Sequence, residues 1–317
     1  MSVISGHLWT LLPSLAHRIR PETAPEAKAW STTLQTLDAG AERTIALSGA
    51  LCEREGSHSL VVIVHGLGGA LDSHYVLRAA RVLDAYGFST LRLALRGADR
   101  KGEDFYHAGL VADLHAAFAS PELARYRKLF VLGYSLGGHV TLHASIEPSD
   151  ARVRAVAAVC APLHLSRGAD AIDRPGAFIY RNHVLSGLKE IYAAVAARRS
   201  VPTPMARIAE VRTIRQWDTL TVVPRHGFAD VEDYYTRMSA GFRLGALSLP
   251  TLLLPSRDDP MVPPSTFEDL LQDASPQLTL RWVEHGGHVG YPSSVALNGK
   301  RLPNVEEHVA RWFQTVG

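Results

Sequence analysis

Short apolar segments alternate with longer amphipathic segments along most of this chain, and this alternation constrains the fold more than any other feature. Four of the apolar segments are interpreted as buried strands: 59–65, 89–95, 128–134 and 154–160. A helical pattern follows each of the first three: 74–86, 109–120 and 136–146. Strands that are apolar along their whole length are typical of a parallel sheet with helices on both faces. The pattern predicts an α/β fold with a mostly parallel central sheet.

The alternation is interrupted once, between residues 162 and 247, where helical patterns occur without a clear strand. It then resumes in four segments: 250–256, 265–271, 278–284 and 305–313. An insertion of this length inside an α/β pattern favours a cap over the sheet rather than a structureless loop. We therefore expect a core formed by residues 1–161 and 248–317, with an inserted helical cap at 162–247.

Composition limits the class of protein. The 317 residues, 46% of them hydrophobic, are ample for a buried core. A formal net charge of +2 gives no reason to expect a nucleic-acid partner. Cys52 and Cys160 are too few for a disulfide framework or a thiolate zinc site, so a reducing compartment is expected.

The N-terminal apolar run at 8–15 does not fit a signal peptide, because it lacks a preceding basic segment and contains Pro13. No run of about 18 apolar residues occurs elsewhere. We therefore expect a soluble cytoplasmic protein without an integral membrane segment. Its oligomeric state stays open between monomer and dimer.

A G-x-S-x-G pattern lies at the junction of a predicted strand and a predicted helix, at residues 133–137. A serine at the apex of such a sharp turn has a strained backbone, and its hydroxyl projects above the sheet. The backbone N–H of Leu136 and the positive end of the helix then face the oxygen that becomes charged during acyl transfer. The pattern therefore indicates that Ser135 is a nucleophile.

Two other glycine-rich motifs do not fit this turn. A phosphate-binding loop requires G-x-x-x-x-G-K-[ST], whereas His139 follows the glycines here. No G-x-G-x-x-G follows the first strand, so a dinucleotide is not expected. A plain strand-to-helix connection with an incidental serine stays open on this motif alone.

A serine nucleophile needs a base, and the base needs an acid to orient it. In α/β-hydrolases these residues follow the order Ser, Asp or Glu, His, and each is expected at the end of a strand. Asp259 begins a D-x-x-x-P pattern, the usual setting of this acid in the α/β-hydrolases that the segment resembles, while Asp258 is expected to cap the local turn. His288 lies among glycines that let it reach the serine, while His285 is expected to be a partly exposed neighbour. The predicted catalytic triad is Ser135, Asp259 and His288.

The segment VHGLGG at 64–69 resembles the His-Gly oxyanion loop of α/β-hydrolases. On this resemblance, the N–H groups of Leu67 and Leu136 form the oxyanion hole, and His65 braces the loop. The other histidines show no metal-ligand spacing such as H-E-x-x-H, so no metal is predicted. No cofactor is expected either.

Three further segments carry a more specific resemblance. GHLWTLLPSL is similar to an "HLQT" segment, with Trp9 in place of glutamine, and ALRGADRKGEDFYHAGLVADL to "RG…YHSG…DL", with Ala108 in place of serine. Residues 213–235 are similar to "FDD…T…GF…DYY". Together these segments resemble the YheT-type α/β-hydrolases along the whole chain.

The resemblance implies the α/β-hydrolase fold, the triad, a helical cap and hydrolysis of carboxylic esters, often with short or medium acyl chains. A small-molecule or lipid-like ester is therefore the expected substrate. Two alternatives stay open: an acyltransferase that uses the same triad, and a non-catalytic ligand-binding protein of the same fold.

Two groups of residues in the insertion each have two interpretations. The arginines either attract an anionic lipid surface or a carboxylate-bearing ester, or they form a solvated face whose ion pairs come from other elements. These are Arg198, Arg199, Arg207, Arg212 and Arg215. The aromatic residues either line an acyl pocket or form the core of the cap. These are Trp217, Phe228, Tyr234 and Tyr235.

Overall fold

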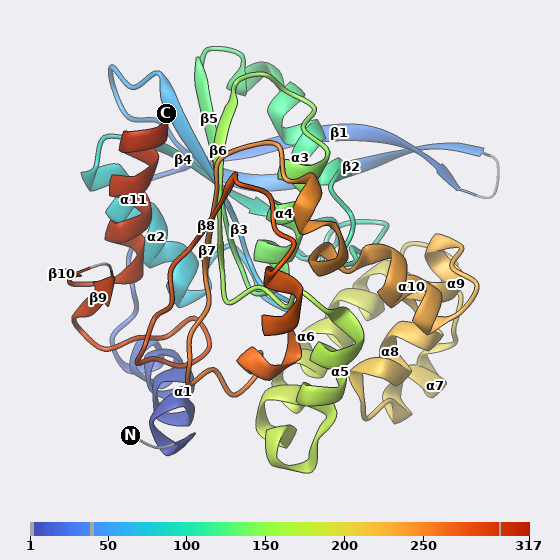
Figure 1. The fold of residues 1–317 in the computed structure, drawn as a ribbon. Coiled ribbons are helices and arrows are strands. Elements are labelled where there is room, and N and C mark those ends of the chain that lie inside the picture. The colour runs from blue at the N-terminus through green and yellow to red at the C-terminus, as the bar shows by residue number, and fades with distance from the viewer. Residues whose placement is uncertain (1–2, 39–40, 298) are drawn as a thin grey trace.

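The centre of the molecule is an eight-stranded sheet in the order β1-β2-β4-β3-β5-β6-β7-β8 (Figure 1). The computed structural model describes residues 3–38, 41–297 and 299–317. Six neighbouring strands pair in parallel: β3 (Ser59–Val64), β4 (Ser89–Ala94), β5 (Lys128–Tyr134), β6 (Val153–Val159), β7 (Thr251–Leu254) and β8 (Leu278–Leu280). The predicted mostly parallel sheet is confirmed.

Helices cover both faces of this sheet, which explains why its strands are apolar throughout. On one face, α2 (His74–Ala85) and α11 (Val305–Val316) pack on Val61 and Ile63 of β3. On the other face, α3 (Ala112–Ala119) and α4 (Leu136–Ile146) share a core with Val62 and Val64 (Figure 1). Successive side chains of a strand point to opposite faces, so both sets are buried.

The N-terminal part of the chain forms elements that the sequence analysis did not predict. After α1 (Val3–Ile19), the strands β1 (Lys28–Asp38) and β2 (Ala41–Cys52) form an antiparallel pair, and β2 joins the main sheet antiparallel to β4. In β2 the buried apolar residues Ile45, Leu47 and Leu51 occur at odd positions, and Cys52 at the end of the strand is buried as well. This alternation differs from the continuous apolar runs of the parallel strands.

Six α-helices follow one another between β6 and β7. They are α5 (Leu165–Asp173), α6 (Phe178–Ala196), α7 (Met205–Glu210), α8 (Ile214–Leu220), α9 (Val222–His226) and α10 (Val231–Met238). They gather on one side of the molecule, at the lower right of Figure 1. Arg225 of α9 anchors them to the core through Asp104, whose carboxylate lies 2.8 Å from its Nε and also pairs with Arg96.

The remaining elements are short. Where the sequence predicts one helix at 265–271, two 3₁₀ turns occur, because Phe267 has an extended φ of −152°. These and the other short elements are η1 (Pro121–Leu123), η2 (Pro175–Ala177), η3 (Ala240–Ala246), η4 (Pro264–Thr266), η5 (Glu268–Leu271), β9 (Val295–Leu297) and β10 (Lys300–Leu302).

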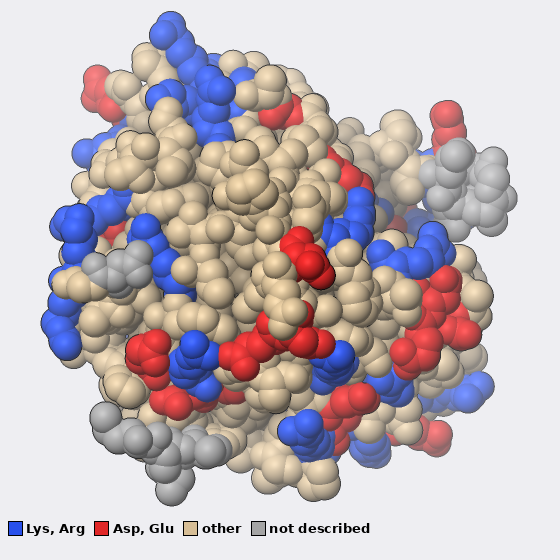
Figure 2. All heavy atoms as spheres, viewed as in Figure 1, with Lys and Arg blue, Asp and Glu red and all other residues tan. Residues whose placement is uncertain are grey.

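The surface carries charges of both signs. In the view of Figure 2, basic and acidic side chains lie next to one another across the lower half of the molecule. Within the described ranges, no helix is long and apolar enough to cross a membrane.

Candidate active site

Ser135 lies in the turn between β5 and α4. Its φ of 52° and ψ of −121° place it in a backbone region that residues other than glycine rarely adopt. Two hydrogen bonds hold this conformation: the N–H of Ser135 donates to the carbonyl of Val159 at 2.8 Å, and its own carbonyl accepts from the N–H of His139 at 3.0 Å. Strained residues of this kind concentrate at functional sites.

The glycines of the G-x-S-x-G pattern are required by close packing. A Cβ on Gly133 would lie 2.2 Å from the carbonyl oxygen of Gly137. A Cβ on Gly137 would lie 2.3 Å from the carbonyl oxygen of His65. Side chains at these positions would therefore push α4 away from the sheet and move Ser135.

His288 and Asp259 form a buried hydrogen-bonded pair. Nδ1 of His288 lies 2.8 Å from Oδ2 of Asp259, and Oδ1 of Asp259 accepts the N–H groups of Met261 and Val262. Burial alone would raise the pKa of Asp259, but His288 and the two N–H donors outweigh it and lower that pKa below its usual value. The ionised carboxylate accepts the Nδ1 proton, which leaves Nε2 of His288 free to act as a base.

The structure brings Ser135 and His288 to one cavity of about 540 Å³, which both side chains line. Among the described residues, no hydrogen bond joins the Ser135 hydroxyl to His288. Such contacts are often long in free enzymes and tighten when the substrate binds.

The neighbouring candidates lie elsewhere. The carboxylate of Asp258 lies 3.4 Å from the hydroxyl of Ser5 and 3.8 Å from Nδ1 of His285. Asp258 therefore does not cap the local turn as expected, because Asp259 accepts the N–H groups of that turn as well as binding His288. His285 is exposed, as expected for a histidine that neighbours His288 without belonging to the triad.

The N-terminal helix positions the loop that carries His288, a contact that the sequence analysis missed. The backbone N–H of His288 donates to the hydroxyl of Thr10 at 2.8 Å. A Cβ on Gly287 would lie 2.3 Å from the carbonyl oxygen of Gly6. Thr10 is the threonine of the segment that resembles "HLQT", so the resemblance was the signal for this contact.

Two tyrosines fix the loop at 65–69. The N–H of Gly66 donates to the hydroxyl of Tyr75 at 3.0 Å, and the N–H of Gly68 donates to the hydroxyl of Tyr106 at 2.8 Å. The N–H of Leu67, between them, has no acceptor among the residues that the structure describes. Tyr106 comes from the segment that resembles "RG…YHSG…DL".

The same loop lies beside the serine. A Cβ on Gly66 would lie 3.2 Å from the Cβ of Ser135, and both Leu67 and Leu136 line the cavity with that serine. Leu136 is the first residue of α4, where backbone N–H groups lack an intrahelical acceptor. The two N–H groups predicted for an oxyanion hole are therefore both without an acceptor in the described part of the chain.

His65 braces this loop. Its Nε2 accepts the N–H of Leu95 at 3.2 Å, so its Nδ1 carries the proton and donates to the carbonyl of Gly66 at 2.8 Å. Burial lowers the pKa of His65 to about 4, which keeps the ring neutral.

Three of the four aromatic residues named in the insertion fit both interpretations, a buried core and a pocket wall. Trp217, Tyr234 and Tyr235 are buried in a hydrophobic cluster that the insertion shares with the sheet, and they also line the cavity. Phe228 does not line it and packs on the rings of Tyr234 and His107. Helices α5, α6, α8, α9 and α10 thus supply much of the apolar wall of the cavity that Ser135 also lines.

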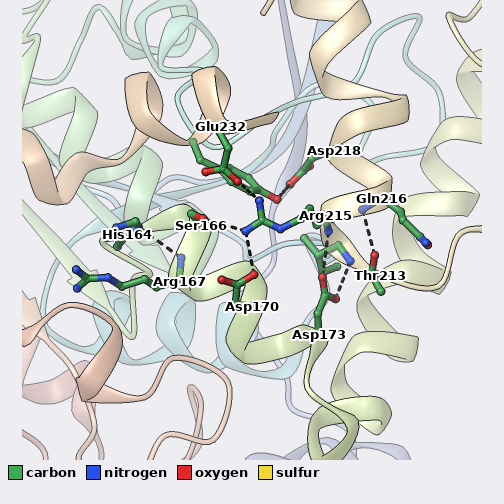
Figure 3. A network of polar contacts seen from close by, with 12 residues as sticks. His164, Ser166, Arg167, Asp170, Asp173, Thr213, Arg215, Gln216, Asp218 and Glu232 are labelled. Carbon is green, nitrogen blue, oxygen red and sulfur yellow. Dashed lines mark hydrogen bonds and ion pairs between the residues drawn. The ribbon is translucent and has the colours of Figure 1, made fainter. Parts of the chain in front are cut away.

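Arg215 of α8 belongs to a polar network that joins this helix to α5 and α10 (Figure 3). Its guanidinium lies 2.9 Å from Asp170 of α5, pairs with Glu232 of α10 and stacks over the ring of Tyr235 at 5.2 Å. Other elements thus supply the ion pairs of this arginine. Arg198 and Arg212 instead donate to carbonyl groups of nearby helices.

Asp218 is a buried carboxyl on the cavity wall. Its Oδ2 accepts the hydroxyl of Tyr235 at 2.7 Å (Figure 3), and no other hydrogen bond to its side chain occurs among the described residues. Burial raises the pKa of Asp218 to about 7. This carboxyl therefore titrates near neutral pH.

We expect Asp218→Asn to change how stability depends on pH. An aspartate has a pKa of about 3.9 when unfolded, so the stabilising contribution of Asp218 is complete below that pH and is lost as the pH rises to about 7. The wild type should lose up to about 4 kcal/mol relative to the variant across this range. Urea unfolding at pH values of about 4, 6 and 8 measures this difference. If the free energy of unfolding changed with pH in the same way for both proteins, the prediction would be contradicted.

Cys160, Asp259 and His288 offer three potential metal-ligand atoms within 4.8 Å of one another. A metal ion would need a thiolate and a free Nδ1. Burial raises the pKa of the Cys160 thiol, so it stays protonated, and the imidazole and the carboxylate are bonded to each other. The group does not fit a metal while the His288–Asp259 pair is intact.

Known proteins are similar to this chain in sequence. Residues 55–289 match the model of the Hydrolase_4 family, described as serine aminopeptidase, S33. "Putative esterase YheT" of Escherichia coli (strain K12) is 29% identical over 80% of this chain and 76% of its own length. The monoacylglycerol lipase of Saccharomyces cerevisiae is 26% identical over 73% of this chain, which spans only 54% of that protein.

A solved structure is similar in fold. The esterase domain of a Rhodothermus marinus protein superposes with a TM-score of 0.51 and 17% sequence identity, over 91% of this chain and 100% of that domain. The predicted α/β-hydrolase fold and the resemblance to the YheT-type proteins are confirmed by these comparisons.

Proposed function

Because this chain belongs to the Hydrolase_4 family of serine hydrolases, we propose that it cleaves carboxylic esters through an acyl-enzyme on Ser135. The observation that carries the proposal is a serine in a strained turn that lines the same cavity as His288, whose Nδ1 is hydrogen-bonded to the buried Asp259. The names of the similar proteins, an esterase and a monoacylglycerol lipase, favour esters over peptides.

In the proposed reaction the hydroxyl of Ser135 attacks the ester carbonyl while Nε2 of His288 takes its proton. The tetrahedral oxyanion receives hydrogen bonds from the N–H groups of Leu67 and Leu136. His288 then returns the proton to the leaving alcohol, and Asp259 stabilises the imidazolium between these steps. Water repeats the cycle on the acyl-enzyme and releases the acid.

The lining of the cavity also favours an ester. An aminopeptidase must bind the ammonium group of its substrate, and an anionic side chain is the usual partner for it. Asp218 is the only carboxyl among the described residues that line the cavity. Its side chain is buried and already accepts the hydroxyl of Tyr235. The rest of the wall is mostly apolar and suits an acyl chain, and the volume of about 540 Å³ is typical of small-molecule sites.

A series of p-nitrophenyl esters from acetate to palmitate tests the proposal. We expect turnover of short and medium acyl chains, a decline towards palmitate, and no release of p-nitroaniline from aminoacyl p-nitroanilides. Turnover of the anilides alone, or of no ester in the series, would overturn the proposed function.

Tyr106→Phe should lower kcat about tenfold and leave KM nearly unchanged. The change removes the acceptor of the Gly68 N–H, so the adjacent N–H of Leu67 loses part of its alignment with the oxyanion, an interaction made only in the transition state. Steady-state kinetics with p-nitrophenyl butyrate measures both constants. The matched control is Tyr86→Phe, which removes a hydrogen bond to Glu307 between α2 and α11. Equal kcat values for the two variants would contradict this positioning role.

We further propose a reducing compartment, such as the cytoplasm, as the location of this enzyme. Cys52 and Cys160 are both free and buried, so no disulfide contributes to this fold within the described residues. The expected partner is its substrate, a small-molecule or lipid-like ester.

A further inference from the structure

Large apolar side chains are exposed at two places beside the cavity. Four of them, Leu8, Leu12, Leu15 and Ile19, follow one another at helical spacing along one face of α1 and are 46% to 87% exposed. Two more, Phe178 and Ile179, begin α6 and are about half exposed. Among the described residues, only Met205, Phe242 and Val316 are further exposed large apolar side chains.

The exposed stripe of α1 is not the face by which this helix packs. Gly6 and Thr10 contact the loop that carries Gly287 and His288. The packing of α1 is therefore already provided by its other side. An apolar stripe that stays exposed on a helix already packed through its other side is typical of an interaction surface.

The two exposed groups are neighbours. Nδ1 of His7 in α1 lies 2.6 Å from the hydroxyl of Tyr180 in α6, and the two rings stack at 5.7 Å. Tyr180 directly follows the exposed pair of α6. We call the six side chains together the α1–α6 apolar face: Leu8, Leu12, Leu15, Ile19, Phe178 and Ile179.

The cavity opens within this face. Of the described residues that line it, four are exposed: Leu15, Arg18, Ile179 and His183. All four belong to α1 or α6, whereas the other lining residues are buried or half-buried. A substrate that reaches Ser135 therefore passes between these two helices.

Unneutralised positive charge borders the same face. Arg18 and Arg20 lie at the end of α1 and Arg174 lies four residues before Phe178. Within the described part of the chain, none of these three arginines forms an ion pair. Arginines beside an apolar face suit the anionic headgroups and acyl chains of a lipid layer.

We propose that the α1–α6 apolar face docks on an anionic lipid surface, so that a lipid ester passes from the layer directly into the cavity. This inference rests on the proposed ester hydrolysis and names the place from which its substrate comes. A protein partner seated on the face would close the opening, whereas a lipid layer supplies substrate through it.

Flotation with vesicles of phosphatidylcholine and phosphatidylglycerol tests the docking. The wild type should bind, and Leu12→Ser combined with Ile19→Ser should weaken binding at least about tenfold, because two apolar side chains no longer enter the layer. Neither residue lines the cavity, so hydrolysis of dissolved p-nitrophenyl butyrate should stay within about twofold of the wild type. Hydrolysis of an ester embedded in the vesicles should fall with binding.

Two further variants define the result. Phe242→Ser removes an exposed aromatic side chain elsewhere and should leave binding unchanged. Arg20→Gln with Arg174→Gln should weaken binding to the anionic vesicles and reduce its salt dependence. A wild type that stays unbound, or equal binding by the leucine–isoleucine variant, overturns the docking without affecting the ester hydrolysis. A wild-type dimer in sedimentation that this variant dissociates would instead assign the face to a second copy of the chain.

Discussion

Ser135→Ala should lower kcat for p-nitrophenyl butyrate by about 10⁴-fold or more. The variant has no hydroxyl to form the acyl-enzyme, and what remains is the catalysis that the oxyanion hole and substrate binding give to attack by water. The cavity and the His288–Asp259 pair stay in place because the change removes a single oxygen atom. Steady-state kinetics on the purified variant measures the loss, and circular dichroism checks that the fold is kept.

A control shows that the loss is specific to this serine. Ser265→Ala removes an exposed serine hydroxyl within η4 and should retain the full rate. If Ser135→Ala kept more than a few per cent of the wild-type kcat, another group would have to be the nucleophile.

Asp259→Asn should lower kcat by about 10⁴-fold while the protein stays folded. An asparagine at this position donates an N–H to Nδ1 of His288, which moves the ring proton to Nε2, and that nitrogen then cannot accept the proton of Ser135. The amide oxygen still accepts the N–H groups of Met261 and Val262, so the turn keeps its hydrogen bonds. Kinetics with the same ester measures the effect.

The neighbouring aspartate provides the matched control. Asp258→Asn makes the same chemical change one residue earlier, where the side chain contacts Ser5 and His285 rather than His288. It should reduce kcat by less than about threefold. Comparable losses in the two variants would contradict the choice of Asp259 as the acid.

Most of the parallel sheet and the turn at Ser135 could be predicted from sequence because their causes are local. A strand buried on both faces must be apolar throughout, as residues 60–64 are. The glycine at 133 follows from contacts within one strand-to-helix turn. Such requirements appear as short patterns and need no knowledge of distant segments.

Other features depend on contacts between distant parts of the chain. Thr10 holds the backbone of His288 across 278 residues, and Tyr106 fixes the loop at Gly68 from 38 residues away. No periodicity or local motif predicts such pairs. The strands β1 and β2 were missed for another reason: their alternating pattern is typical of antiparallel strands at the edge of a sheet, which the parallel pattern does not describe.

The insertion shows where patterns leave a question open. Its aromatic residues fit both a buried core and a pocket wall, and Trp217 serves both because it is buried in the hydrophobic cluster and also lines the cavity. The partners of Arg215 come from α5 and α10, which are 45 residues before it and 17 residues after it. Composition alone does not predict which residues pair with Arg215.

Labelling with a fluorophosphonate probe, followed by peptide mass spectrometry, tests most directly whether Ser135 is an activated nucleophile. We expect one adduct per chain on the peptide that contains Ser135, no adduct in Ser135→Ala, and much slower labelling of Asp259→Asn than of Asp258→Asn. An unlabelled wild type would indicate a ligand-binding protein of this fold without catalysis. An adduct that persists in Ser135→Ala would place the nucleophile elsewhere, and either result would contradict the proposed mechanism.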